Sequence, residues 1–279
     1  MKKGVYILPS LCTTGNAICG FYSIISVING IILQSEGDVK RAEQAFIASA
    51  YAIIFGIIFD GLDGRIARFM KSTSRFGLEF DSLADLISFG IAPGLLVYCW
   101  ALRPYGKVGW LAALLFVICG ALRLARFNSQ ASEGKSRYFT GLPIPAAAGT
   151  IASLIIFYFS HWDTLKGFLR YRAVFSVVVV YILAFLMVST IKFRSLKEFD
   201  IKKRKPFNVV LGLILLIFII IMKPQMMVFL IFWSYAAFGL CDGTYSFVKR
   251  LVSSKEVPEG EKAIFRRKRK RMVHEDGNN

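Results

Sequence analysis

The chain has 279 residues, of which 55% are hydrophobic, and it carries a formal net charge of +17 and a mean hydropathy of +0.54. This apolar content excludes a disordered chain, and 23 glycines and five cysteines exclude collagen-like and disulfide-framework proteins. Basic proteins that bind nucleic acid are rarely so apolar, so no nucleic-acid partner is expected. High apolarity with strong positive charge favours a membrane protein whose Lys and Arg residues lie mainly on one side.

Apolar runs of about 20 residues are long enough to cross a bilayer as helices. We predict an all-α integral membrane protein with about eight transmembrane helices and both termini on one side. The predicted spans are residues 11–33, 45–61, 82–101, 108–122, 144–160, 173–189, 207–222 and 226–248.

Basic residues are distributed unequally between the two sides of these spans. If the N-terminus is cytoplasmic, 27 of the 35 Lys and Arg residues lie on the cytoplasmic side. This asymmetry follows the positive-inside rule and predicts a multi-pass protein of the cell (inner) membrane with cytoplasmic termini. The basic tail leaves open an alternative in which the chain is a scaffold that binds anionic lipid.

Four of the 18 acidic residues lie together at the end of the second predicted span and the start of the third, on the cytoplasmic side. Asp60 and Asp63 are three residues apart and Asp81 and Asp85 four apart, so each pair shares one face of its helix. Four unpaired carboxylates inside a membrane would cost roughly 10–14 kcal/mol. Two divalent cations would neutralise them. Oxygen ligands suit Mg²⁺ or Mn²⁺, and a pair of metals can clamp a phosphoryl group during displacement.

The residues around the acids fit a phosphate-containing substrate. Gly64 and Gly77 leave room for a phosphate to approach, and Arg68 offers a planar fork for it. In the alternative interpretation, the acids form ordinary surface ion pairs with Arg65, Arg68 and Arg75. Four acids, two glycines and an arginine in register favour the metal site.

This segment resembles the signature of the CDP-alcohol phosphotransferase family, D-x-x-D-G-x-x-A-R-x(8)-G-x-x-x-D-x-x-x-D. The fixed positions are present as Asp60, Asp63, Gly64, Ala67, Arg68, Gly77, Asp81 and Asp85. The resemblance implies a six-helix catalytic core in the membrane and a homodimer. It also implies transfer of a substituted phosphoryl group from a CDP-linked donor to an alcohol, with release of CMP.

The resemblance assigns roles to individual residues. Asp60, Asp63 and Asp81 are expected to bind one divalent cation, Mg²⁺ or Mn²⁺, and Asp60, Asp81 and Asp85 a second. Asp85 is the expected catalytic residue, which accepts the proton of the attacking hydroxyl. The residues expected to bind the CDP-linked donor are Asn16, Gly64, Ala67, Arg68, Ser74 and Gly77.

Further segments are similar to the branch of this family that uses CDP-diacylglycerol and L-serine. They are residues 8–16, 81–93, 123–128 and 141–148. The similarity covers about residues 1–190, which we expect to form the catalytic core. Residues 191–250 would add two transmembrane helices, and residues 251–279 a basic cytoplasmic tail.

A serine acceptor needs a cation for its carboxylate. Arg123 and Arg126 are three residues apart and share a helix side. Asn128 could add a hydrogen bond, and Gly141 and Pro143 complete the predicted serine-binding set.

Alternatives remain open for several of these residues. The two arginines could only anchor a helix end in the interface, Asn16 could only join two helices, and residues 141–145 could form a plain turn.

Two rival functions also remain open. In one, the same chemistry uses another alcohol, such as glycerol 3-phosphate or inositol phosphate, or an archaeal ether-lipid donor. In the other, the chain is a membrane transporter, although we find no internal duplication of helices. A covalent histidine mechanism, which uses H-x-K motifs, is excluded because neither His161 nor His274 is followed two residues later by Lys.

Overall fold

The computed structural model describes residues 7–69, 75–132, 141–161, 171–189 and 223–255. Every regular element in these ranges is a helix, which confirms the predicted all-α fold. The chain forms two compact units, residues 1–239 and residues 240–279. Of the second unit, the structure describes only the remainder of the last helix.

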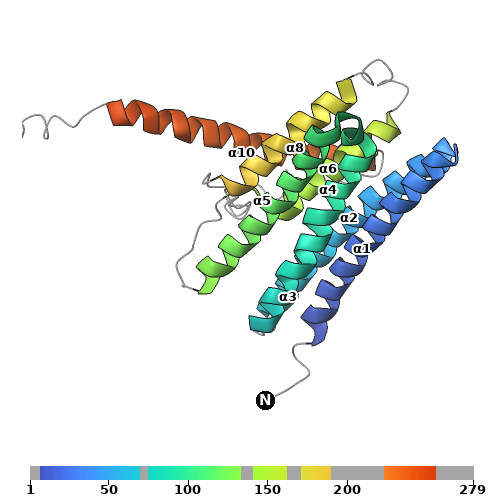
Figure 1. The fold of residues 1–279 in the computed structure, drawn as a ribbon. Coiled ribbons are helices and arrows are strands. Elements are labelled where there is room, and N and C mark those ends of the chain that lie inside the picture. The colour runs from blue at the N-terminus through green and yellow to red at the C-terminus, as the bar shows by residue number, and fades with distance from the viewer. Residues whose placement is uncertain (1–6, 70–74, 133–140, 162–170, 190–222, 256–279) are drawn as a thin grey trace, which may run out of the picture. The chain divides into compact units, whose positions relative to one another are not determined.

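The helices follow one another along the chain (Figure 1). They are α1 (Ile7–Ser35), α2 (Val39–Phe69), α3 (Arg75–Asp85), η2 (Leu86–Ile91), α4 (Ala92–Val97), η3 (Tyr98–Leu102), η4 (Arg103–Tyr105), α5 (Gly106–Ser132), α6 (Ile144–Ser160), α8 (Arg172–Val188) and α10 (Pro224–Lys255). The elements η2 and η3 are π-helices, and η4 is a 3-10 turn. The elements from α3 to η4 form one continuous helical run, and α5 returns antiparallel to it (Figure 1).

Helices cover the predicted spans within the described residues. The span at residues 207–222 lies outside those residues, as does most of the basic tail. Among the described residues, four helical stretches are long and apolar enough to cross a membrane, and α6 and α8 are shorter apolar helices. The total of eight spans stays a prediction.

A tight turn makes α1 and α2 an antiparallel hairpin. Gly37 has φ +86° and follows the last turn of α1, a left-handed conformation that glycine adopts without strain. The N–H of Asp38 donates to the Leu33 carbonyl at 3.0 Å, which satisfies the end of α1. The Asp38 carboxylate then accepts from the Arg41 N–H at 3.1 Å and caps the start of α2.

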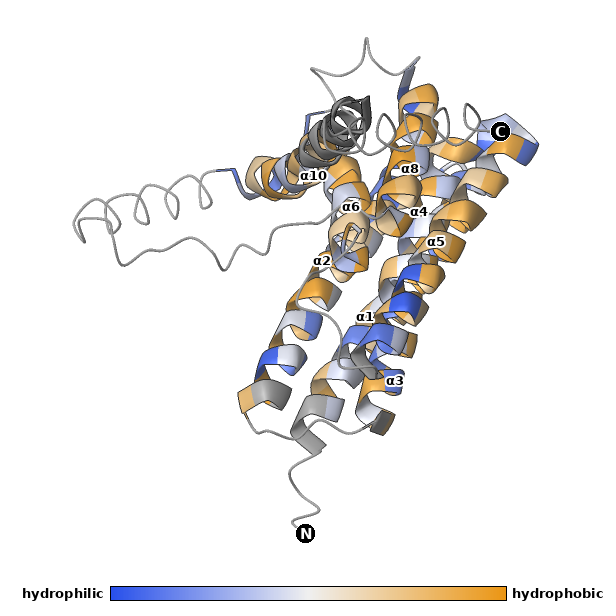
Figure 2. Ribbon diagram, turned by 90° about the vertical axis from the view of Figure 1, so that its left-hand side faces the viewer, coloured by the Kyte–Doolittle hydropathy of each residue, from blue (hydrophilic) through white to orange (hydrophobic). Residues whose placement is uncertain are grey.

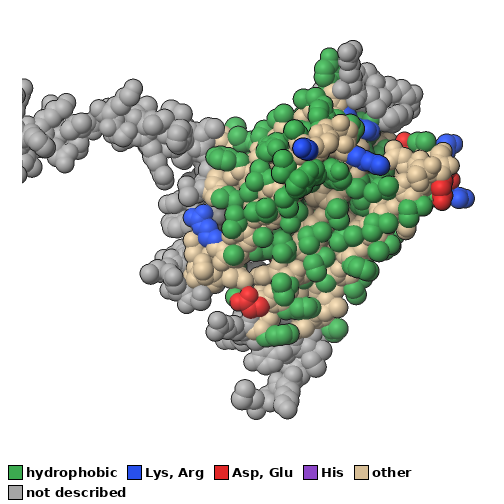
Figure 3. Space-filling view, viewed as in Figure 1, with side chains coloured by type: hydrophobic (Ala, Val, Ile, Leu, Met, Phe, Trp, Pro, Cys, Tyr) green, Lys and Arg blue, Asp and Glu red, His purple; other side chains and the backbone are tan. Residues whose placement is uncertain are grey.

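The surface of the bundle is apolar over most of its length. Hydrophobic side chains fill the middle of the face in Figure 3, and charged side chains lie toward its margins. Figure 2 shows hydrophilic turns gathered near the end of the bundle that holds α3. Helix α1 exposes a stripe of large apolar side chains, namely Leu11, Ile18, Phe21, Ile25, Ile28 and Ile32. An exposed apolar surface this long fits contact with lipid.

The first part of α10 packs against earlier helices within the first unit. Phe229 stacks on Phe157 of α6 with ring centroids 4.4 Å apart, and Trp233 stacks on Phe175 of α8 at 5.7 Å. The part of α10 that belongs to the first unit therefore packs on the bundle around the buried core.

The π-helix η2 accommodates a proline inside the long helical run. Pro93 has no N–H, and in a regular α-helix its ring would collide with the carbonyl of Phe89. The wider π-turn immediately before it instead lets the Ala92 N–H donate to the Ile87 carbonyl. Such π-turns often occur at functional sites, and this one begins directly after Asp85.

Helix α1 approaches the backbone of η2 very closely. A methyl group at Gly20 would come within 2.7 Å of the Ser88 Cα, so only glycine fits at this crossing. The Ser88 hydroxyl donates to the Asn16 carbonyl at 2.8 Å, one turn earlier on α1. Both residues are fully buried, so this contact sets the distance between α1 and the helix that carries Asp85.

We expect Gly20→Ala to lower the stability of the purified protein by about 1–3 kcal/mol, because the added methyl group has no space at this crossing. Thermal unfolding in detergent measures the effect. Ile18→Val is the matched control, since it alters one methyl group on the exposed side of the same helix. Equal unfolding temperatures for the two variants would contradict the tight crossing.

Candidate active site

Asp60 and Asp63 lie in the last third of α2, and Asp81 and Asp85 in the second half of α3. Both helix segments lie toward the end of the bundle where α1 begins (Figure 1). Carboxylate oxygens of Asp60, Asp63 and Asp81 lie within 4.8 Å of one another. Asp85 interacts electrostatically with all three. The two acidic pairs therefore meet across a helix hairpin, as the sequence predicts.

Burial makes this cluster unusual. Asp63 and Asp85 are 5% and 7% exposed, and Asp60 and Asp81 are half-buried. One oxygen of Asp81, Oδ1, is buried without a hydrogen-bond partner among the described residues. Like charges this close repel one another, and each loses hydration on burial. The cluster therefore needs a positively charged partner.

Helix α1 supplies hydrogen bonds that orient two of the carboxylates. The Thr13 hydroxyl donates to Asp63 Oδ2 at 3.0 Å, and the Asn16 amide donates to Asp85 Oδ1 at 3.0 Å. Thr13 and Asn16 are three residues apart and are both buried, so they face the acids from one side of α1. Asn16 does join two helices, and its partner is a carboxylate of the cluster.

Besides its amide nitrogen, the side chain of Asn16 has an oxygen that matters for the site. Its Oδ1 is buried and has no hydrogen-bond partner among the described residues. A methyl group at Gly56 of α2 would lie 3.0 Å from this oxygen, so the glycine leaves it space. Asn16 therefore keeps an acceptor available next to Asp85.

Two glycines of α2, Gly61 and the motif residue Gly64, leave open space beside the acids. A methyl group at Gly61 or Gly64 would meet no other atom within 4 Å. This side of α2 is therefore accessible to a ligand. Gly77 lies in the first turns of α3. Helix α2 also carries Ala67 and Arg68, whose side chains are outside the description, and Ser74 lies outside the described residues.

Arg123 of α5 brings positive charge to the site. It interacts electrostatically with Asp85 and Asp60, and its Nε is buried without a hydrogen-bond partner among the described residues. Tyr235 of α10 interacts with the same guanidinium. Arg126 is half-buried one turn further along α5, and no described hydrogen bond or ion pair joins it to the acids.

Asn128 and the segment at residues 141–143 have contacts of their own. The Asn128 amide donates to the Ser82 hydroxyl at 2.9 Å, which ties α5 to α3 beside Asp81. Gly141 has φ +84° and packs against the end of α8, where the Leu142 N–H donates to the Leu186 carbonyl at 3.0 Å. Among the described contacts, none joins Gly141 or Pro143 to the acids, and the segment forms the turn before α6.

Two residues of the site were not anticipated from the sequence. Thr13 lies three residues before Asn16, so helical periodicity places it on the same face. Tyr235 has no comparable signal, because a single tyrosine in an apolar helix is ordinary at a membrane interface.

The donor set fits a hard divalent cation. Carboxylate oxygens are the ligands that Mg²⁺ and Mn²⁺ prefer, and three of them already converge within bridging distance. Within the described ranges, this is the one group of His, Cys, Asp and Glu side chains close enough to hold a metal ion.

Comparisons with known proteins agree with this geometry. A family profile described as CDP-alcohol phosphatidyltransferase matches residues 6–179. A CDP-diacylglycerol–serine O-phosphatidyltransferase of Helicobacter pylori (strain ATCC 700392 / 26695) is 32% identical over 251 residues, which are 88% of this chain and 94% of the relative. The enzyme of the same name from Bacillus subtilis (strain 168) is 36% identical over 192 residues, 68% of this chain and 92% of the relative. That of Saccharomyces cerevisiae is 38% identical over 146 residues, 50% of each chain.

We expect Asp81→Asn to weaken Mn²⁺ binding to the purified protein by roughly tenfold or more, because affinity at such sites depends on the number of charged ligands. Electron paramagnetic resonance of free Mn²⁺ measures the binding. Asp38→Asn is the matched control, since Asp38 caps the start of α2, at the end of that helix away from the acids. Wild-type affinity in Asp81→Asn would show that the cluster does not hold the metal.

Proposed function

The chain belongs to the CDP-alcohol phosphatidyltransferase family, and we propose that it transfers the phosphatidyl group of CDP-diacylglycerol to the hydroxyl of L-serine and releases CMP. The observation that carries the chemistry is the convergence of Asp60, Asp63 and Asp81 beside a buried Asp85. The choice of donor and acceptor is supported by the names of relatives that match along most of their length.

The four carboxylates are proposed to hold two divalent cations, Mg²⁺ or Mn²⁺. Asp60, Asp63 and Asp81 would bind one, and Asp60, Asp81 and Asp85 the other. When bound, the cations supply positive charge that stabilises the negative charge on the diphosphate and on the leaving CMP. Thr13 keeps Asp63 in place for this role through its 3.0 Å hydrogen bond.

Asp85 is proposed to accept the proton of the serine hydroxyl. The Asn16 amide fixes one of its oxygens, and its burial excludes water that would compete as acceptor. The serine oxygen forms a bond to the phosphorus that carries diacylglycerol. The bond from that phosphorus to the oxygen of CMP breaks, and CMP leaves with the electron pair.

Arg123 is the proposed ligand for the serine carboxylate. Its buried Nε has no hydrogen-bond partner among the described residues, and its guanidinium already lies in the field of Asp85 and Asp60. Tyr235 would restrain the same guanidinium from α10. Arg126 and Asn128 are proposed to border the serine site, with Asn128 held there by Ser82. Gly141 and Pro143 would shape it from the turn before α6.

The CDP-linked part of the donor is proposed to lie along the open side of Gly64. Arg68, Ala67 and Ser74 would contact it, with Gly77 on the facing helix. The acyl chains would stay in the bilayer against the exposed apolar side chains of the bundle. We further propose that the site faces the cytoplasm from the inner membrane and that the protein is a homodimer.

We expect the purified protein to release CMP from CDP-diacylglycerol only with Mg²⁺ or Mn²⁺ and L-serine present. Glycerol 3-phosphate and inositol phosphate should give little product, because a phosphorylated acceptor needs more cations than Arg123 and Arg126 offer. Chromatographic detection of CMP and of the lipid product measures the reaction. Full activity in chelator would refute the requirement for metal ions. A faster reaction with another alcohol would identify that alcohol, and not serine, as the acceptor.

We expect Asp85→Asn to reduce the rate of CMP release by about 10²–10⁴-fold, the usual contribution of a positioned general base. The asparagine keeps the size of the side chain, so thermal unfolding should show an intact fold. Glu36→Gln is the matched control, because Glu36 is an exposed acid just beyond the end of α1 and has no described contact with the site. Wild-type activity in Asp85→Asn would show that Asp85 is not the proton acceptor.

A further inference from the structure

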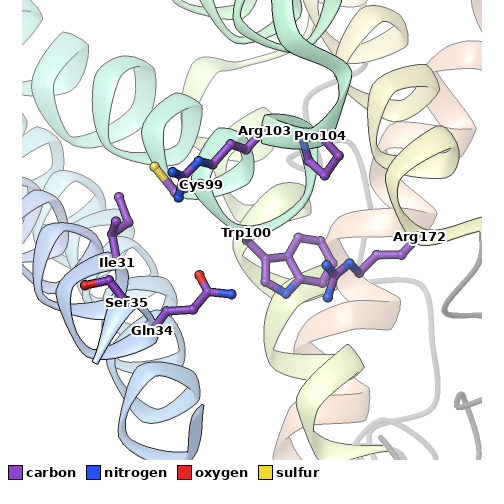
Figure 4. A pocket seen from close by; sticks show the side chains of 8 residues that line it. All are labelled: Ile31, Gln34, Ser35, Cys99, Trp100, Arg103, Pro104 and Arg172. Atoms are coloured by element: carbon purple, nitrogen blue, oxygen red, sulfur yellow. The ribbon is translucent and has the colours of Figure 1, made fainter. Parts of the chain in front are cut away.

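A second polar feature lies in the first unit, away from the acids. It is a cleft of about 580 Å³ between the end of α1, the helical run η3 and η4, and the start of α8 (Figure 4). We name it the arginine cleft, and it is lined by Ile31, Gln34, Ser35, Cys99, Trp100, Arg103, Pro104 and Arg172.

Helix α1 connects the arginine cleft to the acidic site. Asn16 contacts Asp85 near the start of this helix, and Ser35 lines the cleft at its end. The 19 intervening residue steps correspond to about 28 Å along an α-helix. This separation is close to the thickness of the hydrocarbon core of a bilayer, about 30 Å. The cleft therefore lies at the membrane interface opposite the acids.

Arg172 is held in place by two aromatic rings. Its guanidinium carbon lies 5.3 Å from the ring centroid of Trp100 and 5.6 Å from that of Tyr158. Stacking on these faces restricts the planar group, and one side-chain hydrogen bond joins it to Tyr158. A guanidinium has five N–H donors, so others remain able to donate. Arg172 is also the first residue of α8, where a positive charge opposes the helix dipole. Helix stability thus gives no reason for an arginine at this position.

The remaining polar groups of the cleft carry no negative charge. Trp100 is 6% exposed, and its indole Nε1 is buried without a hydrogen-bond partner among the described residues. Arg103 lies across the cleft from Arg172, and Gln34 lies beside the indole ring (Figure 4). None of the described residues that line the cleft is acidic. Glu43 interacts with Tyr158, but within the described residues neither arginine of the cleft forms an ion pair.

We propose that the arginine cleft binds a phosphate group, as the head group of a phospholipid in the leaflet opposite the acidic site. The two guanidinium groups that line the cleft can each donate to the oxygens of a phosphate. The apolar lining from Ile31 and Pro104, and the lipid-facing stripe of α1 next to it, fit the glycerol and acyl parts of a lipid better than a free ion.

The test measures how many phosphatidylglycerol molecules the full-length protein retains in a neutral detergent, by native mass spectrometry. The variants are Arg103→Gln, Arg172→Gln and Trp100→Phe. Arg41→Gln is the matched control, because Arg41 is a 74% exposed cation near the same end of the bundle that does not line the cleft. A second titration with inorganic phosphate distinguishes a lipid head group from the free anion.

We expect wild type and Arg41→Gln to retain one more tightly bound phosphatidylglycerol than either Arg103→Gln or Arg172→Gln. The affinity of that site should fall by about tenfold in each cleft variant, as for loss of one charge-assisted hydrogen bond. Trp100→Phe should weaken it less, since the ring that stacks on Arg172 remains. Displacement of the bound phosphatidylglycerol by inorganic phosphate would show that the cleft binds the free anion as well as the lipid head group, which would contradict a site specific for lipid.

Equal retention of lipid by all variants would overturn the proposal and leave the arginines as membrane anchors. Arg103 is exposed, so Arg103→Gln keeps the test decisive even if Arg172→Gln disturbs the fold. Arg172→Lys separates charge from shape, because it retains the charge and loses the planar fork. Mn²⁺ binding at the acidic site reports that each variant is folded, and it does not depend on the proposed reaction.

Discussion

The bundle is organised around four carboxylates that repel one another in an apolar setting. Each would cost about 2.5–3.5 kcal/mol to place in a membrane on its own. The surrounding residues reduce that penalty: Thr13 and Asn16 donate to two of the acids, and Arg123 brings a positive charge to two of them. What remains is a converging set of oxygens, of which Asp81 Oδ1 has no hydrogen-bond partner in the described part of the chain. The site therefore has a charge and a ligand set that divalent cations complete.

The backbone around Asp85 explains how so many groups reach the same place. Gly20 lets α1 touch η2, and at this crossing Asn16 accepts from Ser88 while it donates to Asp85. One residue thus fixes both the distance between the helices and the orientation of a carboxylate. The π-turn that starts after Asp85 matters because Pro93 removes a backbone donor from the run, and the wider turn restores the hydrogen bonding without ending the helix.

Local periodicity was enough to predict the acidic pairs, since i,i+3 and i,i+4 spacing places Asp60 with Asp63 and Asp81 with Asp85. The apolar runs likewise predicted the helices. Contacts between distant segments were harder. Tyr235 reaches Arg123 from a helix more than 100 residues away, and a lone tyrosine carries no spacing signal. The arginine cleft joins three segments whose lining residues have no motif in common, so only the packing of the helices brings Arg103 near Arg172.

Helix α1 acts at both ends of the bundle. Its first turns orient the carboxylates, and its last turn, with Gln34 and Ser35, lines the arginine cleft. Between these ends it exposes apolar side chains and packs along α2, so it is a continuous helix with one face toward lipid. A membrane enzyme must keep its reacting groups at a fixed depth, although its charged site and its apolar surface favour different environments. Polar residues at both ends of α1 can hold the helix at a fixed depth, because each end contacts polar groups at its own membrane interface.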